Sequence, residues 1–284
     1  MALPSERIEQ YQHDGLLFDV IDSGPLDGKP FVLLHGFPET NQSWNETAVI
    51  LNEQGFRTFA INQRGYSLGA QPKGRHHYRI AKLVSDVKAL IDLIGEPVYL
   101  MGHDWGSAVA WEVVRGYPQQ IIHFTAVSAA HNAAFVRALL TSRQFFKSYY
   151  MALFQLPVIP EVLFKNVNQI GDHLLKNTGM TPAQLITFHQ EIIEKNRLTP
   201  ALNWYRAMPY SFNPHLLDKV KVPTLFVWGK NDTAIGEKCA EYNHYYVDAP
   251  YTEVHLDATH WIPVQNAQQL AHLVLEDIQQ KQAA

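Results

Sequence analysis

Short apolar segments alternate with amphipathic segments along the first half of the chain. Apolar residues recur every three or four positions from Ile80 to Ile94, which predicts a helix that ends at Gly95 and Pro97. Strands that are apolar throughout, with helices between them, indicate a mostly parallel sheet covered by helices on both faces. The predicted strands are Leu16–Ile21, Phe31–Leu34, Thr58–Ile61, Val98–Met101 and Ile121–Val127.

The pattern changes after residue 130. Between His131 and His215 the segments are helical and aromatic-rich, are interrupted by several prolines, and predict no strand. Strands return at Thr224–Trp228 and Thr252–Leu256, and a final helix carries Leu270, Leu273, Val274 and Ile278 on one side. We therefore predict an α/β core formed by residues 1–130 and 216–284, with a helical cap inserted at 131–215.

The composition is that of a globular protein with a sizeable core. Of the 284 residues, 46% are hydrophobic and 12% aromatic, which excludes a disordered chain. The net charge is −4 with no basic block, so we expect no nucleic-acid partner. The single cysteine, Cys239, excludes an intrachain disulfide framework and a multi-cysteine zinc site. Because HExxH, GxGxxG and P-loop motifs do not occur, we expect neither a metal nor an organic cofactor.

The sequence carries no signal for secretion or membrane insertion. The first residues lack a charged region followed by an apolar run. The longest apolar stretch, Tyr149 to Phe164, is interrupted by Gln155 and two prolines and is shorter than the ~18 residues that a span requires. We expect a cytoplasmic protein without a membrane partner, and the sequence does not determine its oligomeric state.

The predicted strand Val98–Met101 runs directly into Gly-His-Asp-Trp-Gly, and a helical segment follows at once. This arrangement is a nucleophile elbow with Asp104 in the nucleophile's place, because the flanking glycines permit a strained turn that lifts one side chain off the sheet edge. The alternative interpretation is an ordinary turn in which Asp104 caps the helix.

A second tight loop, His35 to Pro38, follows the strand Phe31–Leu34 at the same predicted sheet edge. The backbone N–H groups of Phe37 and Trp105 are candidates for an oxyanion hole there. We expect His35, Pro38, Trp105 and Trp261 to line the substrate pocket, and the bond before Pro38 is a candidate cis bond.

Two more polar residues follow predicted strands. Asp232 comes after Thr224–Trp228, and His260 comes after Thr252–Leu256, so the chain order is nucleophile, acid, histidine, as in the α/β-hydrolase triad. Asp257 is the alternative acid. The shared position at strand ends favours the triad more than the residue types do, because the chain contains 14 histidines.

With these motifs the sequence resembles the α/β-hydrolase superfamily, and within it the epoxide hydrolases and their haloalkane dehalogenase relatives. HGFP, GHDWG, the Asp of WGKND and the His of DATHW carry the resemblance, from about residue 16 to residue 270. It implies an α/β-hydrolase fold with an inserted cap, and a small apolar epoxide as substrate. It also implies that Tyr150 and Tyr205 bind and protonate the epoxide oxygen, with Tyr149 as the alternative to Tyr150.

The aspartate itself indicates the reaction. A carboxylate that attacks a saturated carbon forms an ester, which His260-activated water can hydrolyse, whereas a serine would form a stable ether. An epoxide oxygen leaves as an alkoxide and needs an acid; a tyrosine of ordinary pKa would supply up to ~8 kcal/mol of driving force for this proton transfer. A tyrosine-bearing cap therefore favours an epoxide over a halide.

Two other functions stay open. Haloalkane dehalogenases of this kind hold halide between the Trp after the nucleophile and either an Asn in the HGxP loop or a Trp in the cap. Here Trp105 is present, but Phe37 occupies the Asn position, which counts against a dehalogenase. The remaining alternative is a noncatalytic ligand-binding member of the fold.

Overall fold

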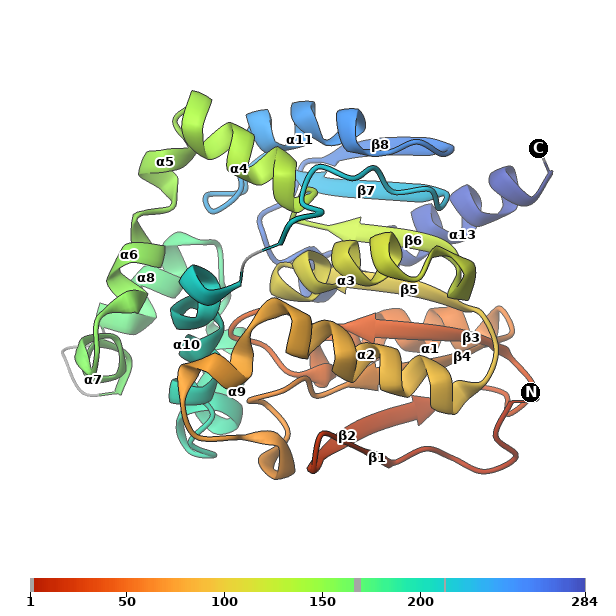
Figure 1. The fold of residues 1–284 in the computed structure, drawn as a ribbon, viewed down its shortest axis with the longest axis horizontal. Helices are drawn as coiled ribbons and strands as arrows, with labels where there is room; N and C mark the ends of the chain where they lie inside the picture. The colour runs from red at the N-terminus through yellow and green to blue at the C-terminus, as the bar shows by residue number, and fades with distance from the viewer. Residues whose placement is uncertain (1–2, 166–169, 212, 284) are drawn as a thin grey trace.

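The computed structural model describes residues 3–165, 170–211 and 213–283. Within these ranges an eight-stranded sheet has the order β1-β2-β4-β3-β5-β6-β7-β8 (Figure 1). The β1/β2 and β2/β4 pairs are antiparallel, and every pair from β4 onward to β8 is parallel. The strands are β1 Gln10–His13, β2 Leu16–Ser23, β3 Lys29–Leu34, β4 Phe56–Ile61, β5 Val98–His103, β6 Ile121–Val127, β7 Thr224–Gly229 and β8 Tyr251–Leu256.

The prediction of a mostly parallel sheet is confirmed, and each of the seven predicted strands is present with ends that differ by at most two residues. Strand β1, a short edge strand in which only Tyr11 is buried, was not predicted. Its signal was the two-residue turn Asp14-Gly15, where both residues have positive φ, 53° and 71°. An Asp-Gly pair between two strands is typical of a β-hairpin.

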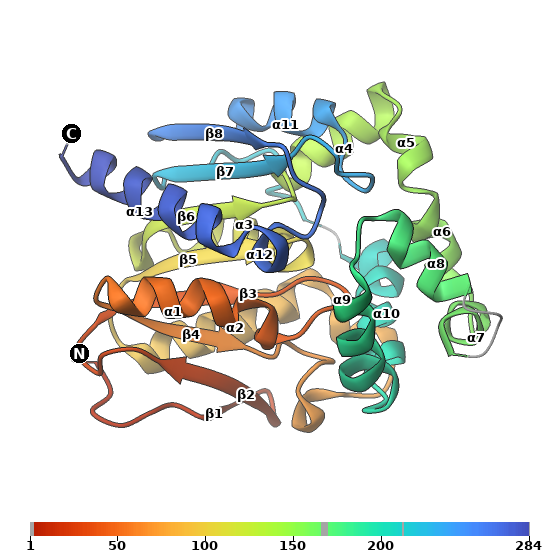
Figure 2. The ribbon, with the colours of Figure 1, turned by 180° about the vertical axis from the view of Figure 1, so that it is seen from behind.

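Helices cover both faces of the sheet (Figures 1 and 2). The predicted helix is α2, Ile80–Ile94, and it ends as expected because Gly95 takes a left-handed conformation with φ 80°. Each face has its own apolar core, so the central strands β3 to β7 are buried almost throughout. One face is covered by α2, α3 Trp105–Gly116 and α11 Glu237–Asn243, and the other by α1 Asn45–Glu53 and α13 Ala267–Ala283.

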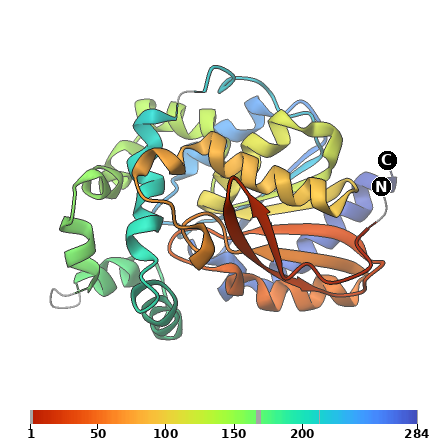
Figure 3. The same ribbon diagram turned by 60° about the horizontal axis from the view of Figure 1, so that its bottom comes forward.

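A group of helices between β6 and β7 lies at one end of the sheet, opposite the end where the two termini lie (Figures 1 and 3). Among its described residues there is no strand, and His189–Ile193 forms a π-helical turn. The division into a core and a cap at 131–215 stays our proposal. The helices are α4 Asn132–Thr141, α5 Gln144–Lys147, α6 Tyr149–Gln155, α7 Ile159–Lys165, α8 Ile170–Asn177, α9 Pro182–Phe188 and α10 Leu198–Ala207, and α12 Ile262–Gln265 follows β8.

No helix in the described part of the chain is both long enough and apolar enough to cross a membrane.

Candidate active site

The turn between β5 and α3 projects Asp104 from the edge of the sheet. Asp104 has φ 50° and ψ −121°, a conformation that an L-residue rarely adopts. The flanking glycines are required by close backbone approach: a Cβ on Gly102 would lie 2.5 Å from the Gly106 carbonyl oxygen, and one on Gly106 would lie 2.2 Å from that of Leu34. The strained conformation predicted for an elbow is therefore present at Asp104.

The Asp104 carboxylate has a backbone donor on one side and a histidine on the other. The N–H of Phe37 donates to Oδ1 at 2.8 Å, and Nε2 of His260 lies 3.6 Å from Oδ2. Burial acts to raise the pKa of Asp104, but His260, the charge of His103 and the Phe37 N–H outweigh it, so the pKa lies below its ordinary value. Asp104 is thus held ionised.

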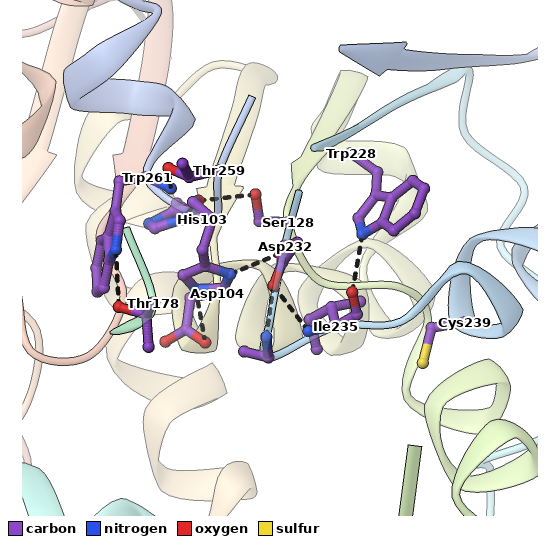
Figure 4. Close-up of polar contacts among 12 residues, drawn as sticks. His103, Asp104, Ser128, Thr178, Trp228, Asp232, Ile235, Cys239, Thr259 and Trp261 are labelled. Atoms are coloured by element: carbon purple, nitrogen blue, oxygen red, sulfur yellow. Dashed lines mark hydrogen bonds and ion pairs between the residues drawn. The ribbon is translucent and has the colours of Figure 1, made fainter. Parts of the chain in front are cut away.

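His260 is oriented by Asp232. Its Nδ1 lies 2.7 Å from Oδ2 of Asp232, and the other oxygen, Oδ1, accepts from the N–H groups of Ala234 and Ile235 at 2.7 and 2.8 Å (Figure 4). Asp257 contacts Asn231 instead, at 2.8 Å from its Nδ2. The structure therefore brings Asp104, His260 and Asp232 together and leaves Asp257 outside.

The histidine is protonated between these carboxylates. Burial acts to lower the pKa of His260, but the charge and hydrogen bond of Asp232 and the nearby Asp104 carboxylate outweigh it and raise the pKa to about 10.

Three buried residues behind the triad were not found from the sequence. Nδ1 of His103 lies 3.1 Å from Oε2 of Glu39, and its Nε2 lies 2.9 Å from the carbonyl oxygen of His260. Ser128 Oγ also donates to that carbonyl, at 3.0 Å. The His103 ring thus links Glu39 to the backbone at His260. His103 stands next to Asp104 and Glu39 follows HGFP, but no spacing in the sequence showed that they meet.

Two cap tyrosines face this group. Tyr150 on α6 and Tyr205 on α10 have ring centroids 6.0 Å apart, and Tyr205 packs at right angles against Trp105 and Phe37. Burial and the charge of Asp104 raise the pKa of both hydroxyls, while the Trp105 side chain acts in the opposite direction at Tyr205. Both hydroxyls are therefore neutral. Tyr149, the alternative to Tyr150, is instead 59% exposed to solvent.

Two neighbouring cavities both have Asp104 and Tyr150 in their linings, and we call them the larger and the smaller lobe of the site. The larger lobe, 430 Å³, is lined by residues that include Phe37, Pro38, Tyr205 and Trp261, and His260 reaches it. The smaller lobe, 290 Å³, lies along α3 past Trp105.

His35 is not among the residues that line either lobe, which corrects the expectation that it contacts substrate. Its side chain turns into the core, where Nε2 accepts from the Gln63 N–H at 3.2 Å. Burial lowers the pKa of His35 to about 3, so the ring is neutral and supports the loop.

The bond between Phe37 and Pro38 is cis, as anticipated. Of the two predicted oxyanion donors, Phe37 reaches Asp104. Among the described residues no hydrogen bond from the Trp105 N–H to that carboxylate is present, so the role of Trp105 as a donor stays a prediction.

A protein-family model for the alpha/beta hydrolase fold matches residues 29–267 of the amino-acid sequence, which is more than half of the chain. With the parallel sheet and the strained turn at Asp104 already described, this match places the chain in the α/β-hydrolase fold family.

Comparison with known relatives identifies a more specific family within this fold family. Epoxide hydrolase 3 of Xenopus tropicalis is 32% identical over 92% of this chain and 74% of its own length. AB hydrolase superfamily protein YfhM of Bacillus subtilis (strain 168) is 31% identical over 93% of this chain and 94% of its own. A crystal structure of Bacillus megaterium epoxide hydrolase with an inhibitor has the same fold, with a TM-score of 0.82, 22% identity, and coverage of 95% of this chain and 99% of that one. The chain is an enzyme of the epoxide hydrolase family.

Proposed function

We propose that the protein adds water to epoxides through a covalent ester on Asp104 and releases vicinal diols. The observation that carries this proposal is the position of one ionised carboxylate, with His260 beside it and two neutral cap tyrosines across the cavity. Two relatives, Epoxide hydrolase 3 of Xenopus tropicalis and Epoxide hydrolase 4 of Homo sapiens, have names that agree with an epoxide substrate.

In the first half-reaction an Asp104 oxygen attacks an epoxide carbon, and the C–O bond of the ring breaks. Tyr150 or Tyr205 gives its proton to the departing oxygen. Because burial and the Asp104 charge raise the pKa of both tyrosines, this transfer has less driving force than the ~8 kcal/mol available to an ordinary tyrosine. Ester formation removes the Asp104 charge and so makes the developing tyrosinate less unfavourable.

Ester formation also prepares the second half-reaction. Once Asp104 is esterified, one of the negative charges that keep His260 protonated is gone. His260 can then transfer its proton to the tyrosinate. Neutral His260 then removes a proton from water, and the hydroxide attacks the ester carbonyl of Asp104 while the Phe37 N–H stabilises the oxyanion. The carbon-bound oxygen leaves with the proton of the new carboxylic acid, which restores ionised Asp104 and protonated His260.

The test is intact-mass analysis of a His260→Gln variant mixed with styrene oxide. Ring opening should proceed and ester hydrolysis should stall, so the protein gains one substrate mass. Asp104→Asn is the matched control, because it has the same size and should gain nothing. Equal mass gain in both variants would place the nucleophile elsewhere.

The tyrosines are tested by replacement with Phe. We expect either single variant to lose rate and Tyr150→Phe/Tyr205→Phe to lose ring opening altogether. Unchanged turnover of the double variant would remove both from the mechanism.

Haloalkane dehalogenation has less support. The cap contains one tryptophan, Trp204, and its indole N–H already donates to the Arg64 carbonyl oxygen at 2.7 Å. Phe37 supplies no side-chain donor in place of an Asn. Trp105 therefore lacks a second side-chain donor of either kind with which to hold a halide. Release of chloride from chlorinated alkanes, without styrene oxide turnover, would favour this alternative.

A further inference from the structure

Most of the exposed residues in the segment 136–165 of the cap are apolar. Between residues 136 and 165, fifteen residues are exposed, and eleven of them are apolar. This range also holds nine of the 21 large hydrophobic residues that are exposed among the described residues. We call these eleven residues, which lie between Val136 and Val162, the apolar cap surface; the most exposed are Leu140, Phe145, Phe146, Tyr149, Val158 and Ile159.

The apolar cap surface lies on the outer end of the molecule. Helices α4, α5, α6 and α7 follow one another along the end that is opposite the two termini (Figures 1 and 3). Phe145 and Phe146 stand on α5 with exposures of 64% and 73%, and Val158, 66% exposed, is held in the connection between α6 and α7. A concentration of exposed apolar side chains of this kind marks an interaction surface.

The charged residues of this surface all have one sign. The exposed charged residues between 136 and 165 are Arg137, Arg143 and Lys165, and no exposed residue in this range is acidic. Residues 131–165 contain four Lys or Arg and one Glu, a net charge of +3 in a chain whose net charge is −4. Glu161, the single acid, is paired with Arg206 at 2.7 Å. The surface is thus basic on a protein that is acidic overall.

Although the sequence predicts no membrane partner, we propose that the apolar cap surface docks onto an anionic lipid bilayer. Apolar side chains flanked by basic residues are the composition of interfacial segments, which enter the boundary between headgroups and acyl chains without spanning the membrane. Two copies that placed this surface face to face would bring like charges together, whereas an anionic lipid surface complements them. The stretch that is too short to span a membrane, Tyr149 to Phe164, contributes seven of the eleven residues of the apolar cap surface.

The position of the cavity gives the docking a consequence. Phe146, Lys147 and Tyr149 line the larger lobe together with Asp104, and Phe146 and Tyr149 are also exposed on the apolar cap surface. An epoxide dissolved in the bilayer would therefore enter the lobe beside the docked surface. This delivery of substrate rests on the proposed function, but docking itself does not.

The test is sedimentation of the full chain with vesicles of phosphatidylcholine alone or mixed with phosphatidylglycerol. We expect binding to the anionic vesicles that weakens as salt is raised. Leu140→Ser/Phe145→Ser should lose more than about tenfold in partition coefficient, because two apolar side chains no longer enter the interface. Arg143→Glu/Lys165→Glu should lose at least about 25-fold in partition coefficient, on the order of a fivefold factor for each basic residue.

A matched control replaces two exposed apolar residues on core helices, Val49→Ser/Leu93→Ser, and should bind as the wild type does. None of these six residues lines either lobe, so every variant should turn over a water-soluble epoxide at the wild-type rate. That measurement separates a failure of docking from a failure of the proposed function.

Three results would overturn the proposal. They are absence of binding to vesicles of both compositions, equal loss in the control and in Leu140→Ser/Phe145→Ser, and lipid-independent dimers that the same double variant dissociates. The last result would assign the surface to a second copy of the chain.

Discussion

The state of His260 depends on the charge of Asp104, and this dependence can be measured. In the free protein Nε2 of His260 lies 3.6 Å from the Asp104 carboxylate, and the pKa of His260 is raised to about 10. Two unit charges at that distance interact by about 4.5 kcal/mol at an effective dielectric constant of about 20, which corresponds to about 3 pKa units. We therefore expect Asp104→Asn to lower the pKa of His260 to about 7.

The assay is an NMR titration of isotope-labelled histidine rings. The His260 signal is the one that disappears in His260→Gln. Asp257→Asn is the control, because it removes a carboxylate that contacts Asn231 rather than His260, and it should move the titration by less than about 0.5 units.

If the pKa of His260 in Asp104→Asn stays within about 0.5 units of the wild-type value, the charge of Asp104 does not control the protonation of His260. In that case esterification of Asp104 would not release a neutral base, and His260 could not activate water by the route proposed. A decrease to near neutrality would instead explain how one histidine is protonated before ring opening and basic afterwards.

Three further predictions concern stability and the loop that carries Asp232. Gln144 is buried and makes hydrogen bonds with Ala234, Gly236 and Ser148, so Gln144→Met should lower the free energy of unfolding in urea by about 2 to 5 kcal/mol. The same variant should slow ester hydrolysis more than ring opening, and an equal effect on both steps would argue that Gln144 does not position Asp232. Arg57 is fully buried and donates two hydrogen bonds to Asp22, at 2.9 and 2.6 Å, so Asp22→Asn should lower the free energy of unfolding by about 3 to 5 kcal/mol. Thermal unfolding followed by circular dichroism measures this loss, and a loss below ~1 kcal/mol would show that the pair is dispensable. The pKa of His260 is raised from 6.5 to about 10 on folding, so its contribution to the unfolding free energy is complete below pH 6.5 and is lost as the pH rises to about 10. In His260→Gln the unfolding free energy should therefore depend less on pH between 6.5 and about 10, and an unchanged dependence would assign it to other groups.

Much of the core could be predicted because its signals are local. Apolar segments identified the parallel strands β3 to β7, and β8 was predicted although polar residues are interspersed with its apolar ones. The period of α2 together with Gly95 gave both ends of that helix. Strand β1 was missed because one buried side chain in four residues leaves no apolar run, although the Asp14-Gly15 turn was informative.

The choice between neighbouring candidates needed tertiary structure. Asp232 and Asp257 both follow strands, yet only the first contacts His260, because the loop after β7 turns it inward through two backbone N–H groups. Tyr149 and Tyr150 are adjacent on α6, and packing against Tyr205 decides which one faces the cavity fully.

The sequence alone determined strands β2 to β8, helix α2, the elbow at Asp104 and the residues that follow the strand ends. Hydrophobic periodicity and glycine positions suffice for these, since both are properties of a short stretch of chain. Tertiary structure decided which side chains meet. Glu39, His103 and the carbonyl of His260 come from distant parts of the chain, and His35 turns away from the cavity that its loop borders. Such contacts depend on the directions of side chains in a packed interior, which the spacing of residues along a chain does not specify.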